Sequence, residues 1–331
     1  MKLRGFLLII FLIGCYAGAE AQGAPPNSAP PQTGNPPASQ QLTPPSTGDT
    51  PTDPESFKKV VDIVPVIFTV TDKHGKFISD LQQRQLKILD NNKPPREVIK
   101  FEAQTDLPLR VGLLIDASNS IRDRFLFEQQ AASEFLHQVI RSKADEAFVL
   151  AFDEIAETAQ ESTNDLDKLT KGIRSIRPGG GTALWDAVYY ACRDKLLKQQ
   201  NKGPVRKVIV LVSDGDDNQS RVLRQEAIEM AQRAEVIIYT ISTNLSNIQD
   251  TGDHNLKMLA EATGGQAFTP FKLQDLASDF NSIQGELRSQ YYIAYKPTDL
   301  LPNGQFRPIQ IVAEDKKLKV RAKKGYYART E

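Results

Sequence analysis

Five oxygen-bearing side chains stand at three points of the sequence where an apolar run gives way to a polar loop. Asp116, Ser118 and Ser120 end or follow the apolar run of VGLLIDASNS, Thr182 precedes a helix-like stretch in GGGTALWDA, and Asp214 ends the apolar run of VIVLVSD. Carboxylates and hydroxyls are hard oxygen donors. They suit a divalent cation such as Mg²⁺, which takes six oxygen ligands at about 2.0–2.1 Å and keeps several waters. The pattern therefore predicts a metal site, provided that the fold brings the three loops together.

The elements around these residues alternate between strands and helices from Leu107 onward, which indicates a parallel sheet. We expect strands at 110–115, 147–152, 208–213 and 236–241, a short antiparallel edge strand at 155–162, and helices near 122–140, 166–176, 183–199, 221–233, 256–262 and 273–288. In open α/β sheets, ligands bind outside the carboxyl ends of the strands. The simpler interpretation is local, because Asp, Ser and Thr also cap helices.

At these five residues the sequence resembles the von Willebrand factor A (VWA) domain and its metal-ion-dependent adhesion site. That pattern has D-x-S-x-S on a first loop, Thr on a second and Asp on a third, and all five positions are filled here without substitution. The resemblance covers roughly residues 107–284 and implies a doubly wound, mostly parallel, Rossmann-like sheet. It also implies that the hydroxyls touch the cation directly, that the carboxylates act partly through water, and that an acidic side chain of a partner protein completes the shell.

β-like sequence flanks this region on both sides. Before it we expect strands at 60–71, 86–89 and 98–101, the last two forming a hairpin around NNKPP; after it, at 291–295, 309–312 and 318–322. The economical interpretation is a small β-sandwich formed by the flanking segments, with the α/β domain inserted into it. The predicted domains are a signal peptide (1–21), a Pro-rich disordered linker (22–55), an N-terminal β half (56–105), a VWA domain (106–285) and a C-terminal β half (286–331). This order also resembles a bacterial exported family described only as VWFA-related.

The N-terminus, MKLRGFLLIIFLIGCYAGAEAQ, predicts export. Lys2 and Arg4 precede an apolar run too short to span a bilayer, which needs about 20 residues, and this is the pattern of a secretory signal. Two processing sites remain open: cleavage after Ala21, or lipobox-type cleavage that leaves Cys15 as a lipid anchor. The mature protein is expected to be periplasmic, envelope-tethered or secreted, with the Pro-rich segment as either a tether or an inert spacer.

Composition and motifs exclude several functions. Lys+Arg and Asp+Glu are both 41 in 331 residues, so the chain lacks the basic excess of a nucleic-acid binder. No G-x-S-x-G elbow or Gly-Lys-Ser/Thr phosphate loop occurs, and we predict neither an enzyme nor a small-molecule substrate. The stretch DGDDN fails as a calcium loop because Gln219 and Gln225 replace the required Gly and Glu. Asp216 and Asp217 are therefore expected to be solvated loop residues.

The expected function is that of an exported, divalent-metal-dependent, adhesion-type binding module. Mg²⁺, or Mn²⁺ or Ca²⁺, would be held by Asp116, Ser118, Ser120, Thr182 and Asp214, and the partner would be a protein with an exposed Asp or Glu. The alternative is a structural or assembly protein of the cell envelope in which the metal only stabilises the loops. The identity of the partner and the oligomeric state do not follow from the sequence.

Overall fold

The computed structural model describes residues 63–103, 107–119, 125–141, 143–201, 205–244, 249–270, 272 and 275–330. The chain divides into two units, Met1–Phe57 and Lys58–Glu331, and every described residue belongs to the second. The predicted signal peptide, both cleavage positions, the Pro-rich segment and Ser120 lie outside the described residues. Within the described ranges, no helix is long and apolar enough to cross a membrane.

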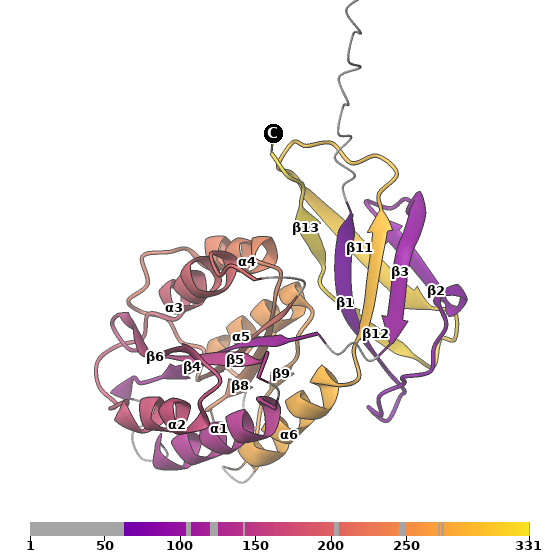
Figure 1. Cartoon of the computed structure of the whole chain (residues 1–331). Helices are drawn as coiled ribbons and strands as arrows, with labels where there is room; N and C mark the ends of the chain where they lie inside the picture. Colours follow the sequence, from indigo (N-terminus) through magenta and orange to yellow (C-terminus); the bar gives the residue numbers. More distant parts are fainter. Residues whose placement is uncertain are drawn as a thin grey trace, which may run out of the picture. The chain divides into compact units, whose positions relative to one another are not determined.

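A six-stranded sheet in the order β6-β5-β4-β7-β8-β9 forms the centre of the α/β domain (Figure 1). Its strands are β4 (Leu109–Asp116), β5 (Glu146–Phe152), β6 (Ala156–Thr163), β7 (Arg206–Ser213), β8 (Val236–Ser242) and β9 (Ala267–Phe268). All pairings are parallel except that of the edge strand β6 with β5. The central strands are buried on both faces, which explains why their sequences are continuous apolar runs.

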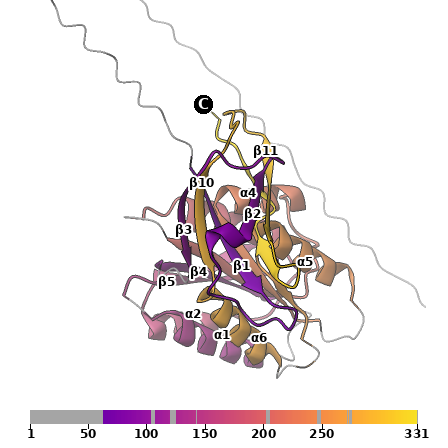
Figure 2. The same ribbon diagram turned by 90° about the vertical axis from the view of Figure 1, so that its right-hand side faces the viewer.

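Helices cover both faces of this sheet. They are α1 (Phe125–Val139), α2 (Leu166–Ser175), α3 (Leu184–Tyr190) continued by a π-helix (Ala191–Leu197), α4 (Arg224–Arg233), α5 (Thr251–Thr263) and α6 (Asp275–Leu287). One hydrophobic core lies under α1, α2 and α6, and the other under α3, α4 and α5. Figure 2 shows α1, α2 and α6 in one row along the sheet. The predicted doubly wound α/β fold is therefore confirmed.

The strand order places a topological switch point between β4 and β7. These neighbours run parallel, with Ile115 opposite Val212. After β4 the chain turns towards the face that carries α1, whereas after β7 it turns towards the face that carries α4. Loops that leave neighbouring strands in opposite directions open a crevice at the carboxyl edge of the sheet, where ligands of such folds bind.

The flanking segments form two antiparallel sheets, as predicted. One has the order β12-β1-β10-β3 and the other β13-β11-β2. Their strands are β1 (Val64–Thr71), β2 (Leu86–Asp90, after a 3₁₀ turn at Gln83–Gln85), β3 (Glu97–Ala103), β10 (Tyr291–Lys296), β11 (Phe306–Ala313), β12 (Lys319–Ala322) and β13 (Gly325–Tyr327). Val66 and Phe68 from the first half and Tyr291 and Ile311 from the second half share one core. Each half therefore buries apolar side chains of the other.

The predicted hairpin of β2 and β3 is wrong. β2 pairs with β11 in one sheet, and β3 pairs with β10 in the other. Between them Asn91 and Asn92 both adopt positive φ, and an isolated bridge joins Asp90 and Lys93 across this turn. The turn thus carries the chain across the sandwich from one sheet to the other, a path that local alternation of side chains does not distinguish from a hairpin.

A buried carboxylate, Glu286, joins the α/β domain to the sandwich. Its Oε1 accepts hydrogen bonds from Tyr239 of β8 (2.8 Å) and from Thr69 of β1 (3.0 Å), and it is paired with Arg321 of β12. Glu286 lies in the last turn of α6, just before β10 begins. The two folded parts are therefore connected by polar bonds as well as by the chain itself.

Candidate metal centre

Asp116 is the last residue of β4 and is fully buried. Its Oδ1 accepts a hydrogen bond from the backbone N–H of Ser118 (2.9 Å), and its Oδ2 accepts one from the Ser213 hydroxyl (2.6 Å). Both carboxylate oxygens are therefore fixed in orientation at the carboxyl edge of the sheet. Ser118 is buried as well, at 3% exposure.

Hydrogen bonds from the backbone and from the side chain of Asn119 fasten the first loop to the loop that carries Thr182. The N–H of Gly179 donates to the carbonyl of Ala117 (2.6 Å), and Asn119 Nδ2 donates to the carbonyl of Gly180 (3.2 Å). Gly180 has φ of +73°, a conformation that glycine adopts at no steric cost. The glycine run of GGGTALWDA is therefore used to bring the second loop against the first.

The Thr182 loop is fastened in turn to the loop after β7. The N–H of Thr182 donates to Asn218 Oδ1 (3.0 Å), and the N–H of Asn218 donates to the carbonyl of Thr182 (3.0 Å). Thr182 itself is buried, at 4% exposure. All three sequence-predicted loops thus meet, and they are held together by bonds of the protein itself.

Thr182 does not cap the helix that follows it. The N-cap position of α3 is Ala183, and the first N–H groups of the helix donate to side chains of the third loop: Leu184 N–H to Asp217 Oδ1 (2.9 Å) and Trp185 N–H to Ser220 Oγ (2.9 Å). The expectation that Asp217 is merely solvated is therefore wrong, because it anchors α3. The capping interpretation of Thr182 fails for the same reason.

The loop after β7 packs against the first turn of α5. Gly215 has φ of +82°, and a Cβ at this position would lie 2.2 Å from the carbonyl oxygen of Gly252. Only glycine fits such a position. Asp214, half-buried, is thereby placed at the same edge of the sheet as Asp116, and its Oδ1 accepts a hydrogen bond from the N–H of Asp216 (3.2 Å).

Burial raises the pKa of Asp116 to about 6, against the hydrogen bonds from Ser213 and Ser118, and the charge of Asp214 raises it further. The pKa of Asp216 is also raised, chiefly by burial and to a smaller extent by the charges of Asp214 and Asp250. The charged neighbours that act on both groups are carboxylates. Such a cluster is stabilised by a cation, so the electrostatics fit a divalent ion.

The donor set fits the ion as well. Among the described residues, no group of three or more His, Cys, Asp or Glu side chains is placed to hold a metal. A cation at this edge would therefore rely on two carboxylates, Asp116 and Asp214, together with the hydroxyls of Ser118 and Thr182. This is a hard, oxygen-only set of the kind that Mg²⁺, Mn²⁺ and Ca²⁺ accept. The placement of Ser120 is not described.

Ser213 and Asn218 were not among the residues predicted for the site. Ser213 orients Asp116, and Asn218 holds both the N–H and the carbonyl of Thr182. The available signal for Ser213 is its place as the one hydroxyl in the apolar run VIVLVSD, directly before the carboxylate.

With fold and geometry known, comparison with other proteins identifies the family. The family profile of the von Willebrand factor type A domain matches residues 111–286, which is more than half of the 331-residue chain. The chain therefore belongs to this family. A search of curated proteins found no match.

Solved structures resemble the chain at low sequence identity. The conserved hypothetical protein BatB from Bacteroides thetaiotaomicron is 16% identical with a TM-score of 0.44, over 55% of this chain and 100% of its own. The vWF domain of the type V pili tip protein Mfa5 from Porphyromonas gingivalis gives 16% and 0.45, over 55% and 95%. A von Willebrand factor type A protein from Catenulispora acidiphila gives 14% and 0.48, over 81% and 74%.

Proposed function

We propose that the chain is a divalent-cation-dependent, adhesion-type protein-binding module whose metal site is the complete adhesion site of the family. Asp116 supports this most directly, because it is a fully buried carboxylate with both oxygens fixed, and the charge that acts on it within the described residues, that of Asp214, is negative. Without a cation this arrangement costs free energy, since a buried charge without an opposite charge is unfavourable. The proposal explains why the fold retains it.

The residues that would hold the ion are Asp116, Ser118, Ser120, Thr182 and Asp214. A bound Mg²⁺ would supply positive charge and an open coordination position for an acidic side chain of a partner protein. The chain's own contribution is to fix the donors: Ser213 orients Asp116, and Asn218 holds the backbone of Thr182. Binding then requires little rearrangement of the protein, which lowers its entropic cost.

The alternative role, in which the cation only holds the loops together, receives less support. Gly179 already donates to Ala117, and Thr182 and Asn218 exchange two hydrogen bonds. The loops therefore have connections of their own. Export to the envelope or the cell exterior, by either processing route, remains part of the proposal. Mass spectrometry of the mature N-terminus would distinguish cleavage after Ala21 from lipidation at Cys15.

The test is calorimetric titration of the purified chain with Mg²⁺, Mn²⁺ and Ca²⁺, before and after the change Asp116→Ala. We expect the wild type to bind and the variant to fold but not bind. The thermal stabilisation by cation, about 2.7 kcal/mol at a hundredfold excess over the dissociation constant, should vanish in the variant. Asp167→Ala is the matched control and should bind as the wild type does, because it removes an exposed carboxylate in the first turn of α2, at the other edge of the sheet.

A second arm concerns the partner. Proteins captured by the wild type from the extracellular fraction should be released by chelator and should be absent with Asp116→Ala. Equal cation uptake by wild type and Asp116→Ala would refute the metal site. Cation binding with partner capture that is unchanged by chelator would instead favour the purely structural role.

A further inference from the structure

A cavity of about 280 Å³ lies at the end of the parallel sheet opposite the candidate metal centre. Lys207 lies at the beginning of β7, whereas Asp214 directly follows the end of that strand. At about 3.3 Å per residue the two positions are separated by roughly 20 Å. Nothing in the proposed cation site therefore accounts for the cavity.

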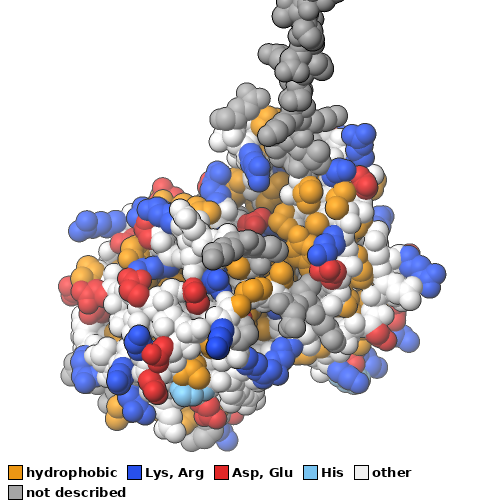
Figure 3. Space-filling view, in the orientation of Figure 1, with side chains coloured by type: hydrophobic (Ala, Val, Ile, Leu, Met, Phe, Trp, Pro, Cys, Tyr) orange, Lys and Arg blue, Asp and Glu red, His pale blue; other side chains and the backbone are white. Residues whose placement is uncertain are grey.

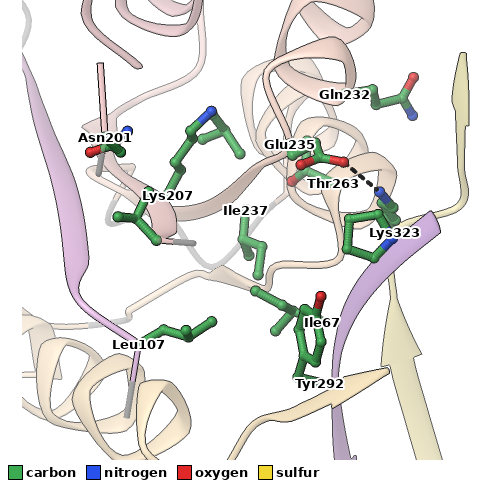
Figure 4. A pocket seen from close by; sticks show the side chains of 13 residues that line it. Ile67, Leu107, Asn201, Lys207, Gln232, Glu235, Ile237, Thr263, Tyr292 and Lys323 are labelled. Atoms are coloured by element: carbon green, nitrogen blue, oxygen red, sulfur yellow. Dashed lines mark ion pairs between the residues drawn. The ribbon is translucent and has the colours of Figure 1, made fainter. Parts of the chain in front are cut away.

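The floor of the cavity is apolar. Ile67 of β1 and Tyr292 of β10 are directly paired across the sandwich sheet and contribute one wall, and Ile237 of β8 and Leu107 contribute the other (Figure 4). In the view of Figure 3, hydrophobic side chains gather over the sandwich. The volume lies just under the range of about 300–1,000 Å³ that is usual for small-molecule sites. The cavity therefore suits a compact ligand with an apolar body.

The opposite side of the cavity carries two ammonium groups and one carboxylate. Lys323 Nζ lies 3.8 Å from Glu235 Oε1, a distance longer than a hydrogen bond, and its side chain is only 11% exposed. Lys207 Nζ donates to the carbonyl of Ala234 (3.1 Å). Burial lowers the pKa of both lysines, although the charge of Glu235 acts in the other direction. The polar side thus has one positive charge in excess.

Two neutral polar side chains of the cavity, those of Gln232 and Thr263, donate their hydrogen bonds to the backbone of the fold. Gln232 Nε2 donates to the carbonyl of Ala262 (3.1 Å), and the hydroxyl of Thr263 donates within α5. These groups build the wall. Lys207 and Lys323 are therefore the charged donors that we expect to recognise a ligand, with the hydroxyl of Tyr292 as a further polar group of the lining.

Glu235 adopts a strained backbone conformation at this position. It follows the C-cap of α4 with φ of +56°, where helices usually place glycine. A residue with a side chain is uncommon there, and such strain gathers at functional sites. The chain tolerates it and thereby places a carboxylate beside Lys323.

We propose that this cavity binds a small amphipathic carboxylate, with its apolar body against Ile67 and Tyr292 and its carboxylate between Lys207 and Lys323. Glu235 offsets one of the two lysine charges while the cavity holds no ligand. The remaining single positive charge matches a monoanion. The apolar floor excludes small hydrophilic anions as good ligands, because they would leave that surface unfilled.

Calorimetric titration of the full chain with sodium decanoate, in the presence of chelator, tests the proposal independently of the cation site. We expect saturable binding of decanoate and none of the neutral analogue 1-decanol under the same conditions. Lys323→Gln should weaken binding about tenfold, the usual effect of losing one charge-assisted contact. Lys324→Gln is the matched control, because the Lys324 side chain is 58% exposed and pairs with Glu261.

A second variant, expected to bind decanoate more tightly, distinguishes the loss of a ligand contact from the loss of the fold. Glu235→Gln removes the competing carboxylate and should tighten decanoate binding several-fold, whereas a damaged fold would weaken it. The proposal is overturned if the wild type does not bind decanoate, if decanol binds as tightly, or if Lys323→Gln leaves the affinity unchanged.

Discussion

The hydroxyl of Ser213, the last residue of β7, donates a 2.6 Å hydrogen bond to Oδ2 of Asp116, the last residue of β4. Two neighbouring strands are thus joined at their carboxyl ends through the carboxylate that the adhesion motif begins with. The same hydroxyl oxygen accepts the N–H of Gly215 (3.0 Å). Ser213 therefore positions both the first loop and the third loop of the candidate metal centre.

Ser213→Ala should weaken Mg²⁺ binding by about 10–100-fold, the usual effect of losing a residue that orients a metal ligand. Ser242→Ala is the matched control. Ser242 is also buried, lies opposite Ser213 at the end of β8, and accepts a similar hydrogen bond from Asn244 N–H (3.1 Å), but it is not bonded to Asp116. Calorimetry on the two variants measures the difference. Equal affinities would show that the contact with Asp116 has no part in cation binding.

A second prediction concerns pH and Asp279 on α6. Its Oδ2 is buried without a hydrogen-bond partner among the described residues, and burial, followed by the charge of Asp275, raises its pKa to about 6 from 3.8. The folded chain therefore holds this proton more tightly than the unfolded chain. Protonation of Asp279 therefore stabilises the folded state at low pH, and this stabilisation is lost as the pH rises from about 4 to above 6.

Asp279→Asn should accordingly raise the free energy of unfolding near neutral pH by about 1 kcal/mol, since the carboxyl group is partly screened by solvent, and should flatten the dependence of that free energy on pH in this window. Urea unfolding at several pH values measures both effects. Asp194→Asn provides a contrast of opposite sign, because Arg193 lowers the pKa of Asp194. A gain in stability from Asp194→Asn, or none from Asp279→Asn, would contradict the assignment.

The sequence predicted the α/β part well because its signals are local. The apolar runs around Val111 and Val208 have the length and continuity of buried parallel strands. The D-x-S-x-S motif and Asp214 stand at the ends of these two runs, and Thr182 directly precedes a helix-like stretch. The order of the strands then follows from the family resemblance. The orientation of Asp116 could not be predicted, since it depends on Ser213, 97 residues away.

The sandwich was predicted in outline but not in pairing. Alternating side chains indicate strands at Leu86–Asp90 and Glu97–Ala103, but their pairing partners lie more than 180 residues away and are not encoded in local alternation. The turn between them contains Asn91 and Asn92 at positive φ, which a hairpin also allows. Likewise, the capping role of Asp217 could not be predicted, because the N–H group that it accepts belongs to Leu184 of α3, 33 residues earlier in the chain.

A third prediction concerns the buried ion pair of the sandwich. Asp90 Oδ1 accepts from Arg307 Nε (2.9 Å) and Nη2 (2.6 Å), and Asp90 Oδ2 accepts from the hydroxyls of Tyr295 and Tyr326 (2.9 Å each). Arg307→Ala leaves a buried carboxylate without its counter-charge and should lower the free energy of unfolding by about 3–5 kcal/mol. Urea unfolding measures this change.

The control for Arg307→Ala is Lys93→Ala. Lys93 pairs with Asp299 at 2.6 Å, but its side chain is 57% exposed, so its loss should cost less than about 1 kcal/mol. Comparable losses in the two variants would mean that burial of Asp90 has no special weight in the stability of the sandwich.

The last prediction follows from the split sandwich. Truncation after Arg288 removes β10, the central partner of both β1 and β3, and with it Tyr291, whose ring stacks on Phe68 at 5.2 Å. The truncation also removes β11 and β12, so the apolar face around Val66 and Phe68 would be exposed and β1, β2 and β3 would all lose the strands they pair with. We therefore expect aggregation, measured by light scattering. A fragment of residues 107–288 should stay folded and monomeric, because its two cores on either side of the central sheet consist almost entirely of residues of the α/β domain. It should nevertheless unfold at a lower temperature than the full chain, because Glu286 loses Arg321 and Thr69. A truncated chain that stays soluble and unfolds cooperatively would show that the N-terminal β half is stable without the C-terminal half.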